Sequence, residues 1–314
     1  MAPTDAGLGL AFSRQDLYRF GQIFEGENVA MRRLLFSAVL MSVLLPALGW
    51  AEVPRLENGK PDLNGVWQVM NRANYGLLAH PAQAVMAMQP GPFGPVPAEE
   101  VVALGAVGAV PAGMGVVEGN EIPYLPGKAE LQRENHADWL NRDPEIKCYL
   151  PGVPRATYLP FPFQIFQSNQ AIFIAYEFAG ATRNLALEDP GEAPVDSWMG
   201  QSYARWEGDT LVVEVTGQLD GTWFDRTGHY HSSALVVTER YTLLNEHVID
   251  YSATINDPEV YERPWTIRMP IYKRVGVDAR LQQFKCVDFV EELLYGDLRK
   301  EPLNPERRSP LAED

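Results

Sequence analysis

The stretch SYARWEGDTLVVEVTG, residues 202–217, decides the fold. Two short runs rich in β-branched and aromatic residues flank Glu207-Gly208-Asp209, a sequence typical of a tight hairpin turn. Similar runs follow at residues 234–244, 247–255, 264–274 and 280–290, and one precedes it at residues 171–178. Short turn sequences such as Asn245-Glu246 separate them. The spacing predicts consecutive antiparallel strands.

Such a series of strands leaves two unpaired edges unless it closes on itself. An earlier strand is expected to begin at Gly65-Val66-Trp67, directly after a polar turn. We therefore predict a mainly β protein in which an antiparallel meander closes into a lipocalin-like β-barrel, preceded by a loop-rich N-terminal arm. A β-sandwich is the alternative. A barrel of this kind holds one small ligand in its mouth or lumen.

The N-terminal part carries a targeting pattern at residues 31–51, MRRLLFSAVLMSVLLPALGWA. Two arginines precede a short apolar run, and Gly49 and Ala51 supply the small residues of a cleavage site. The pattern predicts a signal peptide and a periplasmic or secreted protein, with residues 1–30 as an upstream extension. A buried helix or a single anchor helix is the alternative interpretation.

Beyond the signal peptide, we expect an arm at residues 52–143, a barrel core at 144–300 and a tail at 301–314. Residues 83–117 are rich in Pro, Gly, Ala and Val, a composition that disfavours regular helices and central strands. This segment is interpreted as an ordered arm or lid, or as a mobile loop, and it is the candidate for contacts in a homodimer. Residues 130–140 are expected to form a short helix.

The net charge limits the classes of binding partner, and the cysteine content bears on a possible disulfide. The formal net charge is −15, and the acidic and basic residues of segment 1–51 balance, so the excess belongs to the remainder. A surface of this sign disfavours nucleic acid and anionic membranes, and no membrane insertion is expected after signal cleavage. Cys148 and Cys286 are the only cysteines. In an oxidising compartment they are expected to form a disulfide, with two buried thiols as the alternative.

Five segments carry a resemblance: DLNGVW at 62–67, CYLPGVPRATYLPFPFQI at 148–165, WEGDTLVVE at 206–214, TWFDRTGHYHSSALVVTERY at 222–241 and INDPEVYERPWT at 255–266. Together they resemble a large family of exported bacterial proteins that is abundant in sphingomonads and acidobacteria. The resemblance spans residues 61–292. It implies export and favours a hydrophobic substrate, because these bacteria often degrade aromatic compounds and steroids; it implies no particular activity.

Residues 225–231 contain the sharpest candidate chemistry. Asp225 precedes His231 across a glycine turn, and a carboxylate that orients an imidazole fixes its tautomer and raises its pKa. Glu177, if it points inward from an apolar strand, would be a second acid/base group. We therefore name His231, Asp225 and Glu177 as catalytic candidates. The alternative is structural: Asp225 and His231 cap a turn, and Glu177 pairs with an arginine.

Substrate-binding candidates come from arginines and aromatic residues near the predicted strands. An arginine in an apolar lumen can bind a carboxylate or a developing oxyanion, and it can equally form a structural ion pair with Glu177 or Glu239. Aromatic side chains from loops can line a pocket for a flat ligand, although most must be core. The candidates are Arg155, Arg183, Tyr158, Trp198, Trp223 and Tyr230.

Three functions are compatible with these residues. The leading hypothesis is a periplasmic acid/base enzyme of the lyase or isomerase type that acts on a small hydrophobic molecule, preferably an aromatic one, without a cofactor. The second is a non-catalytic carrier of such a molecule, and the third is a metalloprotein that uses His229 and His231 with a nearby carboxylate. The sequence contains no G-x-G-x-x-G, P-loop, C-x-x-C-H or H-E-x-x-H motif, so no cofactor is expected and no metal ligand is assigned.

Overall fold

A computed structural model describes residues 53–84, 88–91, 94–97, 109–145 and 147–284. The chain divides into two units, Met1–Glu52 and Val53–Asp314, and every described residue belongs to the second. The predicted signal peptide therefore lies outside the described residues, as does Cys286.

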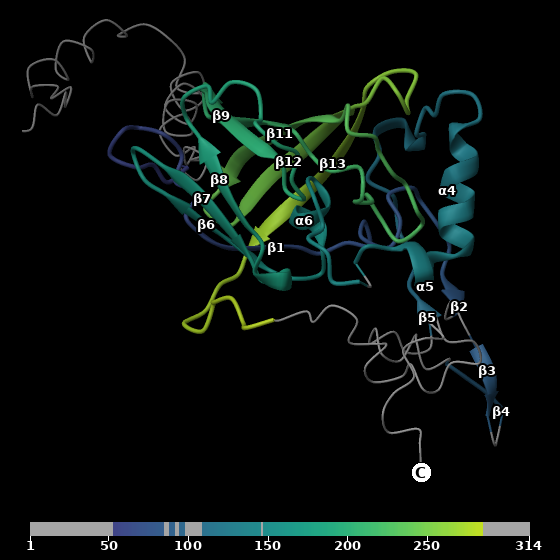
Figure 1. Cartoon of the computed structure of the whole chain (residues 1–314). Coiled ribbons are helices and arrows are strands. Elements are labelled where there is room, and N and C mark those ends of the chain that lie inside the picture. The colour runs from purple at the N-terminus through teal and green to yellow at the C-terminus, as the bar shows by residue number, and fades with distance from the viewer. Residues whose placement is uncertain (1–52, 85–87, 92–93, 98–108, 146, 285–314) are drawn as a thin grey trace, which may run out of the picture. The chain divides into compact units, whose positions relative to one another are not determined.

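Nine of the described strands form a closed barrel, in the order β1-β13-β12-β11-β10-β9-β8-β7-β6 (Figure 1). The strands are β1 (Gly65–Val69), β6 (Phe163–Gln167), β7 (Ile172–Tyr176), β8 (Thr182–Ala186), β9 (Gln201–Glu207), β10 (Thr210–Thr216), β11 (Val236–Asn245), β12 (Val248–Asn256) and β13 (Trp265–Lys273). Strand β1 closes the barrel because it pairs antiparallel with β13 on one side and with β6 on the other. The predicted fold class is confirmed.

One neighbouring pair departs from the antiparallel meander. Strands β8 and β9 are parallel, with Leu185 opposite Ser202 and Ala186 opposite Tyr203. Parallel neighbours need a crossing connection, and residues 187–200 supply it between the two strands. All other neighbours in the barrel are antiparallel, and β9 and β10 form the hairpin that the sequence predicts.

Alternating side chains build the barrel interior. Along β11 and β12, buried and partly exposed positions alternate almost without interruption, as expected for strands with one face on the core. The inward positions of β12 are the apolar residues Ile249, Ala253 and Ile255 together with Tyr251. The lumen is thus a packed core, with a small group of polar side chains that is described below.

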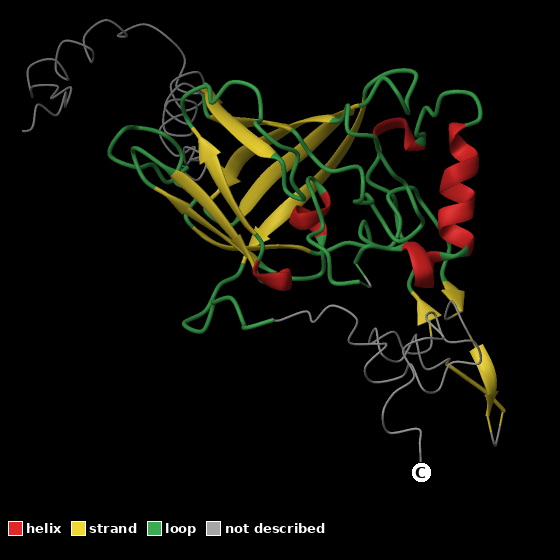
Figure 2. Cartoon of the chain, in the orientation of Figure 1, coloured by secondary structure: helices red, strands yellow, loops and turns green. Residues whose placement is uncertain are grey.

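Loops and short helices cover one end of the barrel and carry the rest of the described chain (Figure 2). The helices are η1 (Glu118–Asn120), α4 (Lys128–Ala137), α5 (Trp139–Arg142), α6 (Arg155–Tyr158) and η2 (Phe178–Gly180). Two small antiparallel pairs, β2 (Gln83–Ala84) with β5 (Ala109–Val110) and β3 (Met88–Gly91) with β4 (Gly94–Pro97), lie in the segment rich in Pro and Gly. The helix expected at 130–140 corresponds to α4 and α5.

The strand expected at residues 280–290 is absent from residues 280–284, the part of it that the structure describes. Residues 281–284 have no regular structure, and 285–290 lie outside the described residues. Strands β6 and β8, by contrast, were not predicted.

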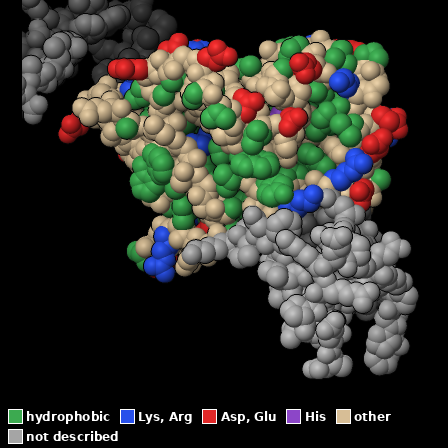
Figure 3. All heavy atoms as spheres, viewed as in Figure 1, with side chains coloured by type: hydrophobic (Ala, Val, Ile, Leu, Met, Phe, Trp, Pro, Cys, Tyr) green, Lys and Arg blue, Asp and Glu red, His purple; other side chains and the backbone are tan. Residues whose placement is uncertain are grey.

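On the face shown in Figure 3, acidic side chains are spread over the surface with apolar and neutral groups between them.

Candidate functional site

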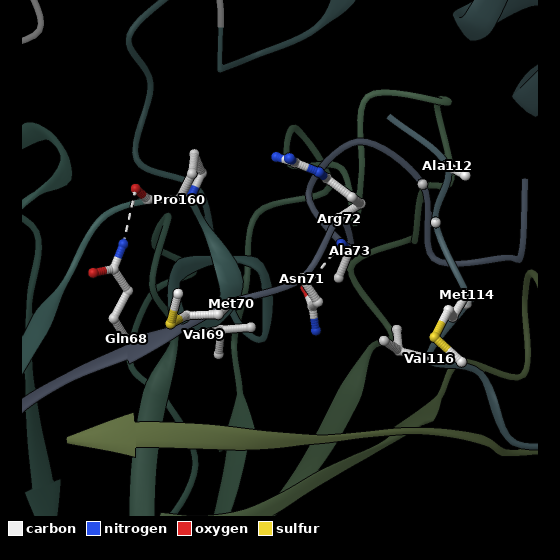
Figure 4. Close-up of a pocket in the computed structure, with 13 residues that line it drawn as sticks. Gln68, Val69, Met70, Asn71, Arg72, Ala73, Ala112, Met114, Val116 and Pro160 are labelled. Carbon is white, nitrogen blue, oxygen red and sulfur yellow. Dashed lines mark hydrogen bonds between the residues drawn. The ribbon is translucent and has the colours of Figure 1, made fainter. Parts of the chain in front are cut away.

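A pocket of about 470 Å³ lies where β1 ends (Figure 4). One wall is the end of β1 and the residues that follow it, 68–73 and Gly76, and the opposite wall is the segment 112–116. Pro160, just after α6, completes the lining. The volume lies within the range that is usual for small-molecule sites.

Backbone hydrogen bonds hold the second wall in place. The N–H of Val116 donates to the carbonyl oxygen of Leu77 at 2.8 Å, and His80 and Gly113 exchange two backbone hydrogen bonds at 2.9 and 3.0 Å. On its other side, the carbonyl oxygen of Val116 accepts the N–H of Arg268 in β13 at 2.9 Å. The segment is therefore anchored both to the residues after β1 and to the barrel.

Two glycines allow the segment 112–116 to pack closely against Ala79 and His80. Gly115 has a φ of +79°, and a Cβ there would lie 2.6 Å from the backbone nitrogen of Ala79. A Cβ on Gly113 would lie 2.4 Å from Nε2 of His80. The wall needs glycine at Gly115, where the close atom is backbone and φ is positive, whereas an added Cβ on Gly113 would meet only the side chain of His80.

The lining is apolar with a few polar groups. Met70 and Met114 are largely exposed, at 78% and 98% of their full accessible surface, and Val69, Ala73 and Val116 add apolar surface between them. Gln68 donates from Nε2 to the carbonyl oxygen of Pro160 at 3.4 Å.

Arg72 is the one ionisable residue in the lining. Its side chain is exposed, and among the described residues it forms no hydrogen bond or ion pair. Asn71 beside it accepts the N–H of Ala73 at 2.9 Å. Among the described lining residues, the pocket thus offers one unpaired cation and otherwise neutral side chains.

A buried ionic cluster lies behind the first wall. Arg155 in α6 contacts Asp143 at 3.0 Å and Glu145 at 2.7 Å, and its Nε donates to the side chain of Asn74 at 2.8 Å. Arg226 donates to both oxygens of Glu145 at 2.9 Å. Arg155, predicted to bind substrate, instead fixes the segment that follows β1.

The pKa values of the two carboxylates in this cluster shift in opposite directions. Burial raises the pKa of Asp143, and Arg155 only partly offsets it. Burial also acts to raise the pKa of Glu145, but Arg226 and Arg155 outweigh it and lower that pKa to about 2. Glu145 is therefore the firmly charged partner of the two arginines.

Asp225 is a fully buried acceptor rather than a neighbour of His231. Its Oδ2 accepts the N–H of Leu77 at 2.8 Å, and its Oδ1 accepts the N–H and the hydroxyl of Thr227 at 3.1 and 2.8 Å. The nearest histidine is His229, whose Nε2 lies 3.9 Å from Oδ2, beyond hydrogen-bonding distance. Asp225 thus organises a turn and holds the pocket segment, in line with the structural alternative.

The histidines on either side of Tyr230 are buried and already bonded within the chain. The Nδ1 atom of His229 lies 2.8 Å from the hydroxyl of Tyr124. The Nδ1 atom of His231 lies 2.8 Å from the carbonyl oxygen of Ser232. Because a carbonyl oxygen can only accept, Nδ1 carries the proton, and the Nε2 atom of His231 accepts the hydroxyl of Thr222 at 2.6 Å. Burial lowers the pKa of both histidines.

Arg183 and Glu239 form a salt bridge of 2.6 Å inside the barrel, where both are buried. The other oxygen of Glu239 accepts the hydroxyls of Tyr241 and Tyr251, both at 2.8 Å. Arg183 also donates to Ser202 at 3.0 Å. The predicted ligand-binding role of Arg183 is thus replaced by the ion pair with Glu239 that was its alternative.

Glu177 does not point into the lumen. Strand β7 ends at Tyr176, and Glu177 is half-exposed and accepts the N–H of Gln282 at 2.6 Å. Ile172, Ile174 and Tyr176 face the interior, so Glu177 follows the outward side of the strand with Phe173 and Ala175.

The aromatic candidates stabilise the structure around these groups. Tyr158 is buried and donates to the carbonyl oxygen of Phe224 at 2.8 Å, and Tyr230 donates to that of Lys128 at 2.9 Å. Trp223 is buried, and Trp198 packs on Tyr149 with ring centroids 4.9 Å apart. None of the four candidates lines the pocket at β1.

No metal centre is apparent among the residues that the structure describes, since no group of three or more suitable side chains converges there. Cys148 is buried with a φ of 59°, and its predicted partner Cys286 falls outside the described part, so the disulfide stays a prediction. Within residues 53–284, as far as they are described, none of the helices has the length and hydropathy of a membrane span.

Comparisons with known proteins add no family. No family model, no curated protein and no solved structure matches the chain. The resemblance described from the sequence therefore stays a prediction, and function has to be argued from the site itself.

Proposed function

We propose that this protein is a non-catalytic carrier that binds a small, largely apolar molecule in the pocket at the end of β1. The observation that carries the proposal is the lining, in which apolar side chains, the amides of Gln68 and Asn71 and the guanidinium of Arg72 surround a volume of about 470 Å³. Pockets that bind small molecules have this composition, with a few polar groups that orient the ligand.

The acid/base hypothesis needs a titratable group that reaches the substrate. His231 and Asp225 use their polar atoms within the chain, and neither of them lines the pocket. The contacts therefore favour the carrier over the enzyme. The experiment below tests both, because it records binding and conversion together.

We also propose that binding takes place outside the cytoplasm and that Cys148 and Cys286 are joined there. Both rest on the sequence, namely the segment at 31–51 and the presence of two cysteines. Expression of the full chain in a Gram-negative host should yield a periplasmic protein whose N-terminus follows Ala51. Its intact mass should increase by about 2 Da on reduction, because two thiols replace one disulfide.

The binding test uses the neutral fluorescent probe N-phenyl-1-naphthylamine with three proteins. Ala112 is exposed and lines the pocket, so Ala112→Trp fills the pocket without disturbing the core. Ala171 is equally exposed but lies in the turn between β6 and β7, so Ala171→Trp is the matched control. We expect saturable binding by the wild type and by Ala171→Trp, and a loss of ~10-fold or more in Ala112→Trp.

Two results would contradict the carrier. Equal binding by Ala112→Trp would place the site elsewhere. Mass spectrometry of the recovered mixture, run with a panel of aromatic compounds, should show each compound unchanged. A product formed by the wild type and lost in His231→Ala would instead establish the acid/base enzyme.

A further inference from the structure

Arg72 places a guanidinium without a partner among the described residues in the lining of the pocket. Most described arginines form a salt bridge with a carboxylate, including the buried Arg155 and Arg183 and the exposed Arg240 and Arg268. Arg72 has no such partner among the described residues, although the chain carries a formal net charge of −15. In a protein with so many carboxylates, a cation left unpaired beside a pocket is available to a ligand.

The position of Arg72 suits recognition of one end of a ligand. In the view of Figure 4, Met70 and Met114 lie on opposite sides of Asn71, and the side chain of Arg72 projects above them. The side chain follows Asn71 directly, and the carbonyl oxygen of Arg72 accepts the N–H groups of Tyr75 and Gly76 at 2.9 and 3.1 Å. The backbone that carries the guanidinium is therefore fixed, while the charged group itself is free.

The chemistry of the walls limits the ligand class. A single guanidinium balances one negative charge, and its planar fork matches a carboxylate in a two-bond arrangement. The rest of the described lining holds no second cation, so a doubly charged phosphate would stay half-compensated. The thioethers of Met70 and Met114 are flexible and polarisable and make favourable contacts with aromatic rings.

We propose that the ligand of this pocket is an apolar monocarboxylate, preferably aromatic, whose carboxylate binds Arg72 and whose body lies against the methionine side chains. This inference rests on the proposed carrier function and specifies its ligand. It also assigns a specificity-determining role to Arg72, which the sequence did not single out.

The test compares 2-naphthoate with its neutral counterpart 2-naphthamide by isothermal titration calorimetry on the full mature protein. The two probes share one ring system and differ in charge. Arg72→Gln removes the cation from the pocket. Arg263→Gln removes an equally exposed arginine, from the loop before β13 and outside the lining, and is the matched control.

We expect the wild type and Arg263→Gln to bind 2-naphthoate more tightly than 2-naphthamide. Arg72→Gln should lose ~10-fold or more in affinity for the carboxylate, since a charge-assisted pair is lost, and should bind the amide as the wild type does. The unchanged amide affinity shows that the variant is folded with its pocket intact.

Failure of this inference is distinct from failure of the carrier function. If the wild type binds both probes with equal affinity and Arg72→Gln changes neither affinity, the pocket binds apolar molecules irrespective of their charge. The inference is then wrong. If Ala112→Trp leaves all binding intact, the pocket is not the site, and the carrier proposal falls first.

Discussion

Asp225 connects the predicted catalytic region to the pocket through backbone groups alone. Its carboxylate accepts the N–H of Leu77, and the carbonyl oxygen of Leu77 accepts the N–H of Val116 in the opposite wall. A carboxylate that accepts several backbone donors in a buried site stabilises one geometry of the chain. At the scale of single residues, Asp225 therefore positions the pocket without entering it.

Replacing Asp225 by Asn tests this role. The amide keeps the shape but loses the charge and one acceptor oxygen, so at least one buried N–H loses its partner. We expect a loss of ~1–3 kcal/mol in the free energy of unfolding, measured in urea, and weaker binding of the neutral probe. The control Asp278→Asn changes an exposed carboxylate and should leave both measurements as in the wild type. Unchanged stability in Asp225→Asn would exclude the positioning role.

The buried histidines predict how stability depends on pH. Burial lowers the pKa of His229 and His231 below the unfolded value of 6.5. Between the folded and unfolded pKa values the unfolded chain binds more protons, so stability is complete above pH 6.5 and decreases as the pH falls below it. Each histidine adds at most ~1.4 kcal/mol per pH unit to this slope.

Urea unfolding between pH 7.5 and 5.5 measures that slope. The double variant His229→Gln, His231→Gln should show a flatter dependence than the wild type, whatever its absolute stability. His247→Gln, which removes a histidine with 54% of its side chain exposed, should keep the wild-type slope. A slope that survives in the double variant would assign the acid sensitivity to other groups.

At the scale of elements, the segment 112–117 has no regular structure of its own and depends on its neighbours. It pairs with His80 on one side and with β13 on the other, where Val117 lies opposite Ile267. Such a wall is held by hydrogen bonds to fixed partners, so its position responds to any change in spacing between them.

Gly115 is the most sensitive point of this wall. Gly115→Ala adds a Cβ at 2.6 Å from the backbone of Ala79 and places alanine at a φ of +79°. Gly59→Ala imposes the same backbone strain at a φ of +77° but meets no atom within 4 Å. We expect both to lose ~1 kcal/mol of stability through strain, and Gly115→Ala alone to weaken probe binding. Equal probe affinities in the two variants would show that the wall tolerates displacement.

The elements also show how far the sequence could be interpreted. Strands β7 and β9 to β13 were predicted because apolar and polar residues alternate along them or because turn sequences bound them. Strand β6 follows a proline-rich stretch, and β8 (TRNLA) has three polar residues, so the sequence did not mark either as a strand although burial alternates along both. Among the site candidates, Arg155, Arg183 and Asp225 are indeed buried polar groups, but sequence alone does not distinguish a functional group from one satisfied by partners far along the chain.

The pocket itself had no sequence signature. Its walls come from residues 68–76 and 112–116, which are distant in sequence, and much of the second wall is glycine and backbone. The polar pair Asn71-Arg72, two residues after the end of β1, was the available hint, because functional residues are often carried by loops at strand ends. The partner segment could not be deduced from a stretch without periodicity.

At the scale of the whole molecule, the salt bridge between Arg183 and Glu239 occupies the lumen that a lipocalin-like barrel would offer to a ligand. Removal of one partner of a buried ion pair leaves the other charge uncompensated and destabilises the fold. The pair links β8 to β11, which are not neighbours in the barrel, and so it fixes the interior across strands.

A double-mutant cycle tests this interior pair. Arg183→Met leaves Glu239 unpaired, Glu239→Gln leaves the guanidinium unpaired, and each should lose ~3–5 kcal/mol of stability. In the double variant no charge remains, and the glutamine oxygen can still accept the hydroxyls of Tyr241 and Tyr251. We expect it to be more stable than either single variant in urea unfolding. Additive losses would show that the two side chains act independently.

Closure of the barrel also affects the tendency of the protein to aggregate at high concentration. An exposed strand edge templates association with other chains, and the described barrel strands present none while the ring is intact. The parallel contact between β8 and β9 aligns only two residue pairs, fewer than any other junction in the ring. Opening there would expose two edges at once. Fibril growth, if it begins anywhere in this barrel, should begin at that seam, and a crosslink across it should delay the onset.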